Sequence, residues 1–299
     1  MTRINNISCN RVDLPPELKR LPAEDYDIAF MKSGQGTPLV LIHGSLSDYR
    51  SWALQIDCFS KHFQTIALSL GHCRPHPWEA NEKNSVIRQQ TNELSVFIKK
   101  LTGGPVHLVG HSRGGSLALL LAAGRPDLFR SLVLVDPAPF DSILSDSKAA
   151  MEALKKRKAF IIDAVDHIKK GDFDKGLEIF TDAVSIKGAW KTLPPADRQI
   201  RRENAWSLTT LLTDAQEPFT CMDTGNIDMP VLLVTAQNSP CLYGMMHTAL
   251  EQRLNNFKKI WISNASHGMH RDNPEQFNVA VLDFLITHNA RERIPGIAQ

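Results

Sequence analysis

The stretch Val106-His107-Leu108-Val109-Gly110-His111-Ser112-Arg113-Gly114-Gly115 decides how this sequence folds. Its first four residues form a mostly apolar run, and residues 114–123 form a second apolar segment that is typical of a helix. A serine between two glycines at a strand-to-helix turn is the G-x-S-x-G motif, in which the serine side chain projects above the edge of a sheet. We therefore interpret Ser112 as a candidate nucleophile, the alternative being a Gly/Ser turn without chemistry.

Short apolar runs that alternate with helix-like segments extend over most of the chain. The expected strands begin with Ile28-Ala-Phe-Met-Lys-Ser33 and continue with residues 38–42, 64–70, 106–109, 132–135, 231–234 and 259–262. The expected helices are 84–101, 114–123, 243–254 and 274–287. This order predicts an α/β fold with a mostly parallel central sheet and helices on both faces. Residues 1–24 are polar and contain prolines, so we expect a surface arm there.

The alternation stops between about residues 140 and 226, where no convincing strand is found. One helical stripe contains Met151, Leu154, Ile161, Val165 and Ile168. Further helices are expected to begin at Asp172 and Pro195. We predict a core of residues 1–139 and 227–299 and an inserted all-helical cap of residues 140–226 over one end of the sheet. The apolar stripe predicts a mainly hydrophobic pocket and a largely apolar small-molecule substrate.

The composition excludes several classes of protein. The 299 residues include 34 Lys and Arg against 32 Asp and Glu, a net charge of +2, which argues against a nucleic-acid binder. The five cysteines are scattered and form no metal motif, and no glycine loop typical of phosphate binding is present, so no metal and no cofactor are expected. The polar N-terminus does not resemble a secretory signal, and no apolar run reaches the ~20 residues that span a bilayer. We expect a reduced, cytoplasmic monomer or homodimer without stable membrane insertion.

With these motifs, residues 28–289 resemble the α/β-hydrolase superfamily. The resemblance depends on motifs in a fixed order: Leu41-Ile-His43-Gly44-Ser45, Trp52, Gly71-His72, the stretch 110–115, and Ala265-Ser266-His267-Gly268 followed by Asn273-Pro274-Glu275. It implies that His267 is the general base and that the backbone amides of Ser45 and Arg113 form the oxyanion hole. It also implies that His43, His72 and His111 brace loops. His270 is the alternative base.

The acid is where the chain departs from the common pattern of this superfamily. Ser239 stands where most relatives have an aspartate, and residues 231–250 contain no carboxylate. Asp136 follows the expected strand 132–135, at the position from which haloalkane dehalogenases and some other members take their acid, and it keeps the order Ser, acid, His. We expect its carboxylate to bond one ring nitrogen of His267 and expect a carboxylate introduced at Ser239 to matter far less. The alternative is that Asp136 only caps the turn before Pro137.

Two classes of function fit these residues. The first is a serine hydrolase that cleaves an ester or related acyl bond through an acyl-enzyme, with carbon–carbon bond hydrolysis by the same triad as a variant. The second is a small-molecule binding protein on the hydrolase scaffold, which the missing aspartate at Ser239 favours. Arg113 is unusual beside a nucleophile; it either braces the oxyanion loop, which we favour, or binds an acidic substrate group.

Overall fold

The computed structural model describes residues 10–14, 18–23, 26–76, 87–144, 147–214, 219 and 224–289. Its centre is one eight-stranded sheet with the order β1-β2-β4-β3-β5-β6-β7-β8. The strands are β1 (Lys19–Pro22), β2 (Asp27–Ser33), β3 (Pro38–Ile42), β4 (Gln64–Leu68), β5 (Val106–His111), β6 (Phe129–Val135), β7 (Val231–Ala236) and β8 (Phe257–Ile262). From β4 to β8 in this order all neighbours are parallel, whereas β2 is antiparallel to both β1 and β4. The predicted mostly parallel sheet is confirmed.

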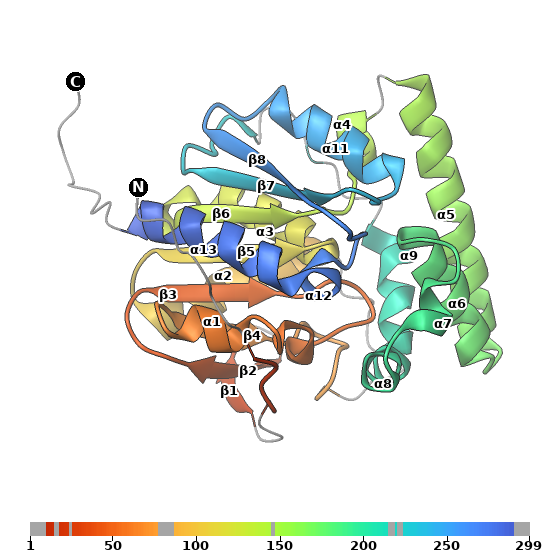
Figure 1. Ribbon diagram of the computed structural model, residues 1–299, viewed down its shortest axis with the longest axis horizontal. Coiled ribbons are helices and arrows are strands. Elements are labelled where there is room, and N and C mark those ends of the chain that lie inside the picture. The colour runs from red at the N-terminus through yellow and green to blue at the C-terminus, as the bar shows by residue number, and fades with distance from the viewer. Residues whose placement is uncertain are drawn as a thin grey trace.

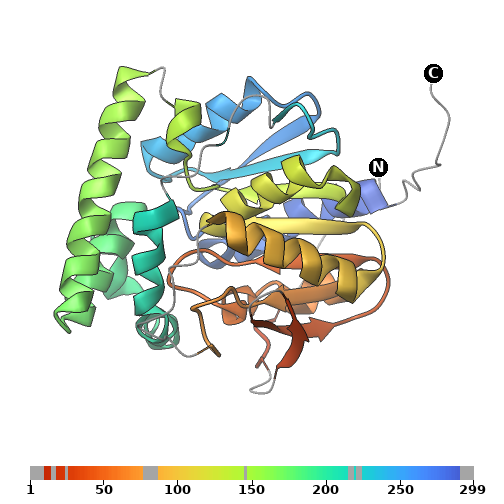
Figure 2. The same cartoon turned by 180° about the vertical axis from the view of Figure 1, so that it is seen from behind.

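Helices cover both faces of the sheet (Figures 1 and 2). One face packs against α2 (Ile87–Thr102), α3 (Arg113–Gly124), α4 (Asp141–Leu144) and α11 (Cys241–Glu251). The other packs against η1 (Tyr49–Trp52), α1 (Ile56–Ser60), α12 (Met269–Asp272) and α13 (Pro274–Asn289). Strands β3 to β7 are buried on both faces, which explains their nearly continuous apolar sequence.

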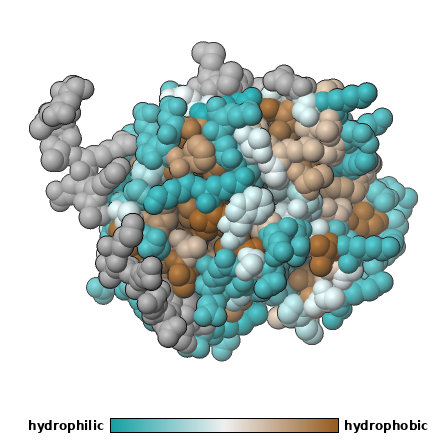
Figure 3. All heavy atoms as spheres, turned by 45° about the horizontal axis from the view of Figure 1, so that its top comes forward, coloured by the Kyte–Doolittle hydropathy of each residue, from teal (hydrophilic) through white to brown (hydrophobic). Residues whose placement is uncertain are grey.

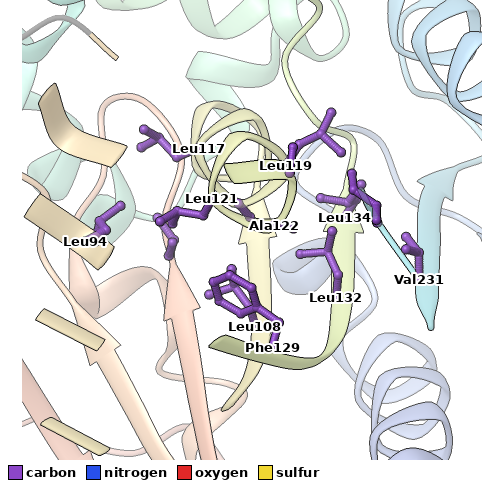
Figure 4. Packing of buried hydrophobic residues seen from close by; sticks show 14 of the residues in the cluster. Leu94, Leu108, Leu117, Leu119, Leu121, Ala122, Phe129, Leu132, Leu134 and Val231 are labelled. Carbon is purple, nitrogen blue, oxygen red and sulfur yellow. The ribbon is translucent and has the colours of Figure 1, made fainter. Parts of the chain in front are cut away.

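The first of these two faces holds the larger hydrophobic cluster. Figure 4 shows part of it, where leucines and an alanine of α3 lie against side chains of β5 and β6. Leu108 of β5 and Leu132 of β6 are completely buried there, as are Leu117 and Leu119 of α3. Because β5 and α3 lie on either side of Ser112, this packing fixes the strand and the helix that flank the Ser112 turn.

A helical block lies beyond the carboxyl ends of the parallel strands (Figure 1). It contains α5 (Lys148–Lys169), α6 (Phe173–Val184), α7 (Ala189–Thr192), α8 (Pro195–Glu203), η3 (Ala205–Thr210) and α9 (Leu211–Asp214). The described residues between β6 and β7 contain no strand, and a hydrophobic cluster of their own joins α5, α6 and η3. The division into a core of 1–139 and 227–299 and a cap of 140–226 stays a prediction, and α4 within that interval packs into the main core.

Three details differ from what the sequence predicts. Part of the expected surface arm is β1, which pairs with β2 because residues 19–22 can extend the edge of the sheet. Met151 does not continue the apolar stripe of α5; it is 57% exposed, because the packing against α6 begins further along the helix. Cys58 is disulfide-bonded, whereas Cys73 and Cys241 are free thiols. Disulfides persist mainly in oxidising compartments, so this bond disagrees with the expected fully reduced state.

The surface carries hydrophobic residues between hydrophilic ones, as the side with β8 and α11 shows (Figure 3). The exposed large residues on β8 are Phe257 and Trp261, and the ammonium of Lys259 lies over the Trp261 ring, 4.9 Å from its centroid. Within the described part of the chain, no helix has both the length and the apolar composition needed to cross a bilayer.

The packing beneath Ser112 yields a stability prediction. Leu108→Ala removes a fully buried side chain at the centre of the sheet and should lower the free energy of unfolding by about 2–5 kcal/mol. The exposed cap residue Ile162, replaced by Ala, should change it by less than about 0.5 kcal/mol. Urea unfolding monitored by circular dichroism measures both. Equal midpoints for the two variants would contradict the packing described above.

Candidate active site

Ser112 occupies a strained turn between β5 and α3. Its backbone has φ 52° and ψ −121°, a region that residues other than glycine rarely adopt. A Cβ on Gly110 would collide with the carbonyl oxygen of Gly114, and a Cβ on Gly114 would collide with the carbonyl oxygens of Ile42 and His43. Glycine is therefore required on both sides of the serine, and the turn presses against the end of β3.

Asp136 and His267 meet at the carboxyl edge of the sheet. His267 Nδ1 lies 3.3 Å from Asp136 Oδ2, at the long end of the hydrogen-bond range, and such bonds often tighten only when substrate binds. Asp136 follows β6, has a positive φ of 39°, and is completely buried. The contact that the sequence led us to expect between these two residues is present.

Two further groups hold the Asp136 carboxylate. His247 of α11 donates from Nε2 to Oδ1 at 3.2 Å, and the Ser239 hydroxyl donates to Oδ2 at 2.5 Å. Burial alone would raise the pKa of Asp136, but the hydrogen bonds from His247 and His267 outweigh it and hold that pKa below its usual range. The Ser239 side chain thus contacts Asp136 directly, besides occupying the position where an aspartate is common.

Tyr243 of α11 stacks on the ring of His267, with centroids 4.1 Å apart and planes 17° from parallel. Burial raises the pKa of Tyr243, an effect that its interaction with the Ser112 side chain only partly offsets, so the hydroxyl stays protonated. Sequence reasoning missed both Tyr243 and His247. Their spacing of four residues, in a helix that begins just after Ser239, places them on one helical face and was the available signal.

Neutral histidines brace the loops around Ser112. His111 Nε2 donates to the carbonyl oxygen of His267 at 2.8 Å, and its ring lies 4.6 Å from that of His270. His43 Nε2 accepts from the amide of Leu70 at 3.0 Å, while Nδ1 lies 2.7 Å from the Gly44 carbonyl oxygen. Burial lowers the pKa of His43 to about 4 and lowers the pKa values of His111 and His270 as well. These rings are uncharged at neutral pH.

The two candidate oxyanion residues approach the serine from different loops. Ser45 lines the cavity beside Ser112, and a Cβ on the preceding Gly44 would lie 2.9 Å from Ser112 Cβ, so this loop touches the nucleophile turn. Arg113 is the first residue of α3, where helix amides lack intrahelical partners. Its guanidinium bonds Gln90 Oε1 of α2 at 2.5 Å and does not line the cavity.

A cavity of about 260 Å³ opens at Ser112 and His267, between the core and the helical block. Its lining is not the mainly hydrophobic one that the cap sequence predicts. Ile161, Val165 and Ile168 pack within the cap's own cluster and do not reach the cavity, because α6 covers that face of α5. Apolar side chains of α6 share the wall with charged ones, which are Arg11, Arg50, Asp197, Arg201, Arg271 and Asp272.

No cofactor site emerges from these residues. Over the described ranges, no three His, Cys, Asp or Glu side chains gather as a metal ion would need. Of the buried histidines near Ser112, His43 and His111 bond backbone groups, and His247 and His267 bond Asp136.

Comparisons with known proteins identify chains that are similar to this one. A model of the alpha/beta hydrolase family matches residues 39–280. The (E)-2-((N-methylformamido)methylene)succinate hydrolase of Acinetobacter baylyi is 26% identical over 265 residues, which cover 86% of this chain and 94% of that protein. The carboxylesterase CesB of Bacillus subtilis superposes with a TM-score of 0.71 at 19% identity, covering 92% of this chain and 93% of its own. A malate-bound esterase of Thermogutta terrifontis gives 0.72 at 18% identity, covering 91% and 99%.

The neutral histidines predict a pH dependence of stability. In the unfolded chain His43 binds a proton below about pH 6.5, but in the fold it stays neutral until about pH 4. The unfolded state therefore binds more protons in this window, and stability falls as the pH falls from 6.5 to 4, on the order of 3 kcal/mol for His43 alone.

Urea midpoints measured from pH 7.5 to 4.5 test this. His43→Gln should flatten the slope, whereas His62→Gln, an exposed control, should leave it as in the parent protein. A parent curve that stays level from pH 6.5 to 4.5 would refute the assignment.

Proposed function

Since this chain belongs to the α/β-hydrolase family and is a hydrolase, we propose that it is a serine hydrolase that cleaves an ester or related acyl bond through a covalent acyl-enzyme on Ser112. The observation that carries the proposal is the convergence of three residues at one cavity. Ser112 sits on its strained turn, His267 lines the same cavity, and the Asp136 carboxylate lies behind His267. The Acinetobacter relative is named a hydrolase, and this supports hydrolysis as the reaction of this chain.

In this mechanism His267 Nε2 accepts the proton as Ser112 Oγ attacks the substrate carbonyl. Asp136 bonds Nδ1–H, fixes the tautomer, and stabilises the imidazolium that forms. The amides of Ser45 and Arg113 donate to the oxyanion, each contributing roughly 3–4 kcal/mol to the transition state. His267 then returns the proton to the leaving group and activates water for release of the acyl group. Tyr243 stacks on the His267 ring and limits the rotation of that ring.

Two alternatives share the scaffold. A carbon–carbon bond hydrolase would use the same three residues with a carbon leaving group. A binding protein without turnover is favoured only by the lack of an aspartate at Ser239, and this argument weakens because Asp136 supplies a carboxylate to His267. A serine with no catalytic role would also not need the strained backbone found at Ser112.

Replacement of the nucleophile tests the proposal. Ser112→Ala should abolish labelling by a fluorophosphonate probe and hydrolysis of 4-nitrophenyl esters, because the attacking oxygen is gone. Ser116→Ala, four residues further along α3, is the matched control and should still label. Thermal unfolding verifies that both variants fold. Full hydrolysis by Ser112→Ala would refute the proposal.

The acid yields a second prediction. Asp136→Asn should lower kcat by up to about 10⁴, as neutralising a triad acid does, whereas Asp127→Asn, at an exposed carboxylate, should not. The contact between Ser239 and Asp136 changes the earlier expectation for Ser239→Asp: two adjacent buried carboxylates cannot both ionise, so this single variant should lose activity.

The double variant tests whether His267 needs a carboxylate at residue 136 itself or only a negative charge nearby. Asp136→Asn with Ser239→Asp keeps one carboxylate beside His267 and should recover part of the activity that Asp136→Asn loses. Steady-state rates for the four proteins decide. An Asp136→Asn variant with unchanged kcat would remove Asp136 from the mechanism.

A further inference from the structure

Two arginines that have no ion-pair partner among the described residues line the cavity that holds Ser112. Arg201 belongs to α8 of the helical block, and Arg271 belongs to α12, four residues after His267. The Nε atom of each is shielded from solvent and has no hydrogen-bond partner. Neither guanidinium lies within 4.0 Å of a carboxylate among the described residues.

Two other arginines nearby are paired with carboxylates. Arg50 also lines the cavity, but its guanidinium pairs with Asp48 at 2.7 Å and Glu203 at 2.6 Å. Arg202, next to Arg201 on the same helix, is exposed and pairs with Asp174. Among the described residues, Arg50 and Arg202 thus pair with carboxylates, whereas Arg201 and Arg271 do not.

The two cavity carboxylates are engaged elsewhere. Asp272 accepts a hydrogen bond from the Ser266 amide at 2.9 Å, and Asp197 lies 3.6 Å from Arg11. Both attract Arg201 from a distance, but burial and the nearby charge of Arg271 prevail and lower the pKa of Arg201 to about 9. Arg201 is still protonated at neutral pH. A partly buried cation without a partner loses hydration that nothing replaces, and an anionic ligand offsets that loss.

Arg271 is fixed close to the base. A Cβ on Gly268 would lie 2.6 Å from Arg271 Nη2, so the guanidinium folds back over the residue that follows His267. The charge of Arg271 also helps to lower the pKa values of His111 and His270, whose rings lie within the same site. One short segment therefore sets the distance between this cation and His267.

We propose that Arg201 and Arg271 form an anion subsite that binds a free carboxylate on the substrate, so that the protein acts on small acyl compounds carrying a negative charge. Guanidinium groups bind carboxylates through paired, charge-assisted hydrogen bonds. A cavity of about 260 Å³ suits a small acid rather than a long acyl chain. The substrate class rests on the proposed function, but binding of the anion does not.

Binding is tested first, without any need for turnover. Isothermal titration of the parent protein with glutarate should show saturable binding, and its neutral counterpart glutaramide should bind at least tenfold more weakly. Arg201→Gln and Arg271→Gln should each weaken glutarate binding roughly ten- to hundredfold, the effect of losing a hydrogen bond to a charged group. Arg202→Gln is the matched control on the same helix and should bind as the parent does. Inorganic phosphate that binds more tightly than glutarate would overturn the carboxylate assignment.

Turnover is tested with two esters of equal chain length, 4-nitrophenyl hydrogen glutarate and 4-nitrophenyl pentanoate, after subtraction of each spontaneous rate. The parent protein should prefer the charged ester by tenfold or more in kcat/KM, and Arg201→Gln should abolish most of that preference. Glutarate binding with no hydrolysis of either ester would refute the serine-hydrolase proposal and leave the subsite intact. Hydrolysis of the neutral ester with no glutarate binding would refute the subsite alone.

Discussion

The buried carboxylate of Asp136 is the constraint around which the site is organised. A completely buried charge is tolerated only when hydrogen bonds replace the water it has lost. Here the donors come from three separate segments: the hydroxyl of Ser239 after β7, His247 within α11, and His267 after β8. Satisfying one carboxylate thereby fixes the positions of the two connections that follow the last two strands. His267 reaches the cavity because Asp136 holds it from behind.

The second constraint is the close approach of backbones at Ser112. The turn lies so near the end of β3 that no side chain fits on Gly110 or Gly114. This contact brings the Ser45 loop against Ser112, and His43 ties the same loop to the residues after β4. Strain at Ser112 is maintained because the core beneath it, on β5 and α3, is fully packed.

Charge is distributed unevenly over the cavity. His43, His111 and His270 are neutral because burial lowers their pKa values, so these three rings add no charge beside Ser112. The cavity wall instead carries positive charge that is unpaired among the described residues, on Arg201 from the helical block and on Arg271 from the segment after His267. A substrate bound by these two groups would be oriented between the cap and the base before any bond changes. Orientation of this kind lowers the entropic part of the barrier.

The sequence by itself determined the sheet, because strands buried on both faces must be apolar along their whole length, and every apolar run expected to be a strand is one. It also indicated the turn at Ser112, since only glycine tolerates that backbone crowding. The sequence did not decide which residues distant in the chain these side chains meet. The donors to Asp136 from Ser239 and His247, the stacking of Tyr243 on His267, and the lack of an ion-pair partner for Arg201 and Arg271 among the described residues depend on how α8, α11 and α12 pack. For the same reason, the prediction of a mainly hydrophobic pocket from the apolar stripe of α5 was wrong. A hydrophobic face shows that a helix is covered, and only the tertiary structure decides whether a ligand or another helix covers it.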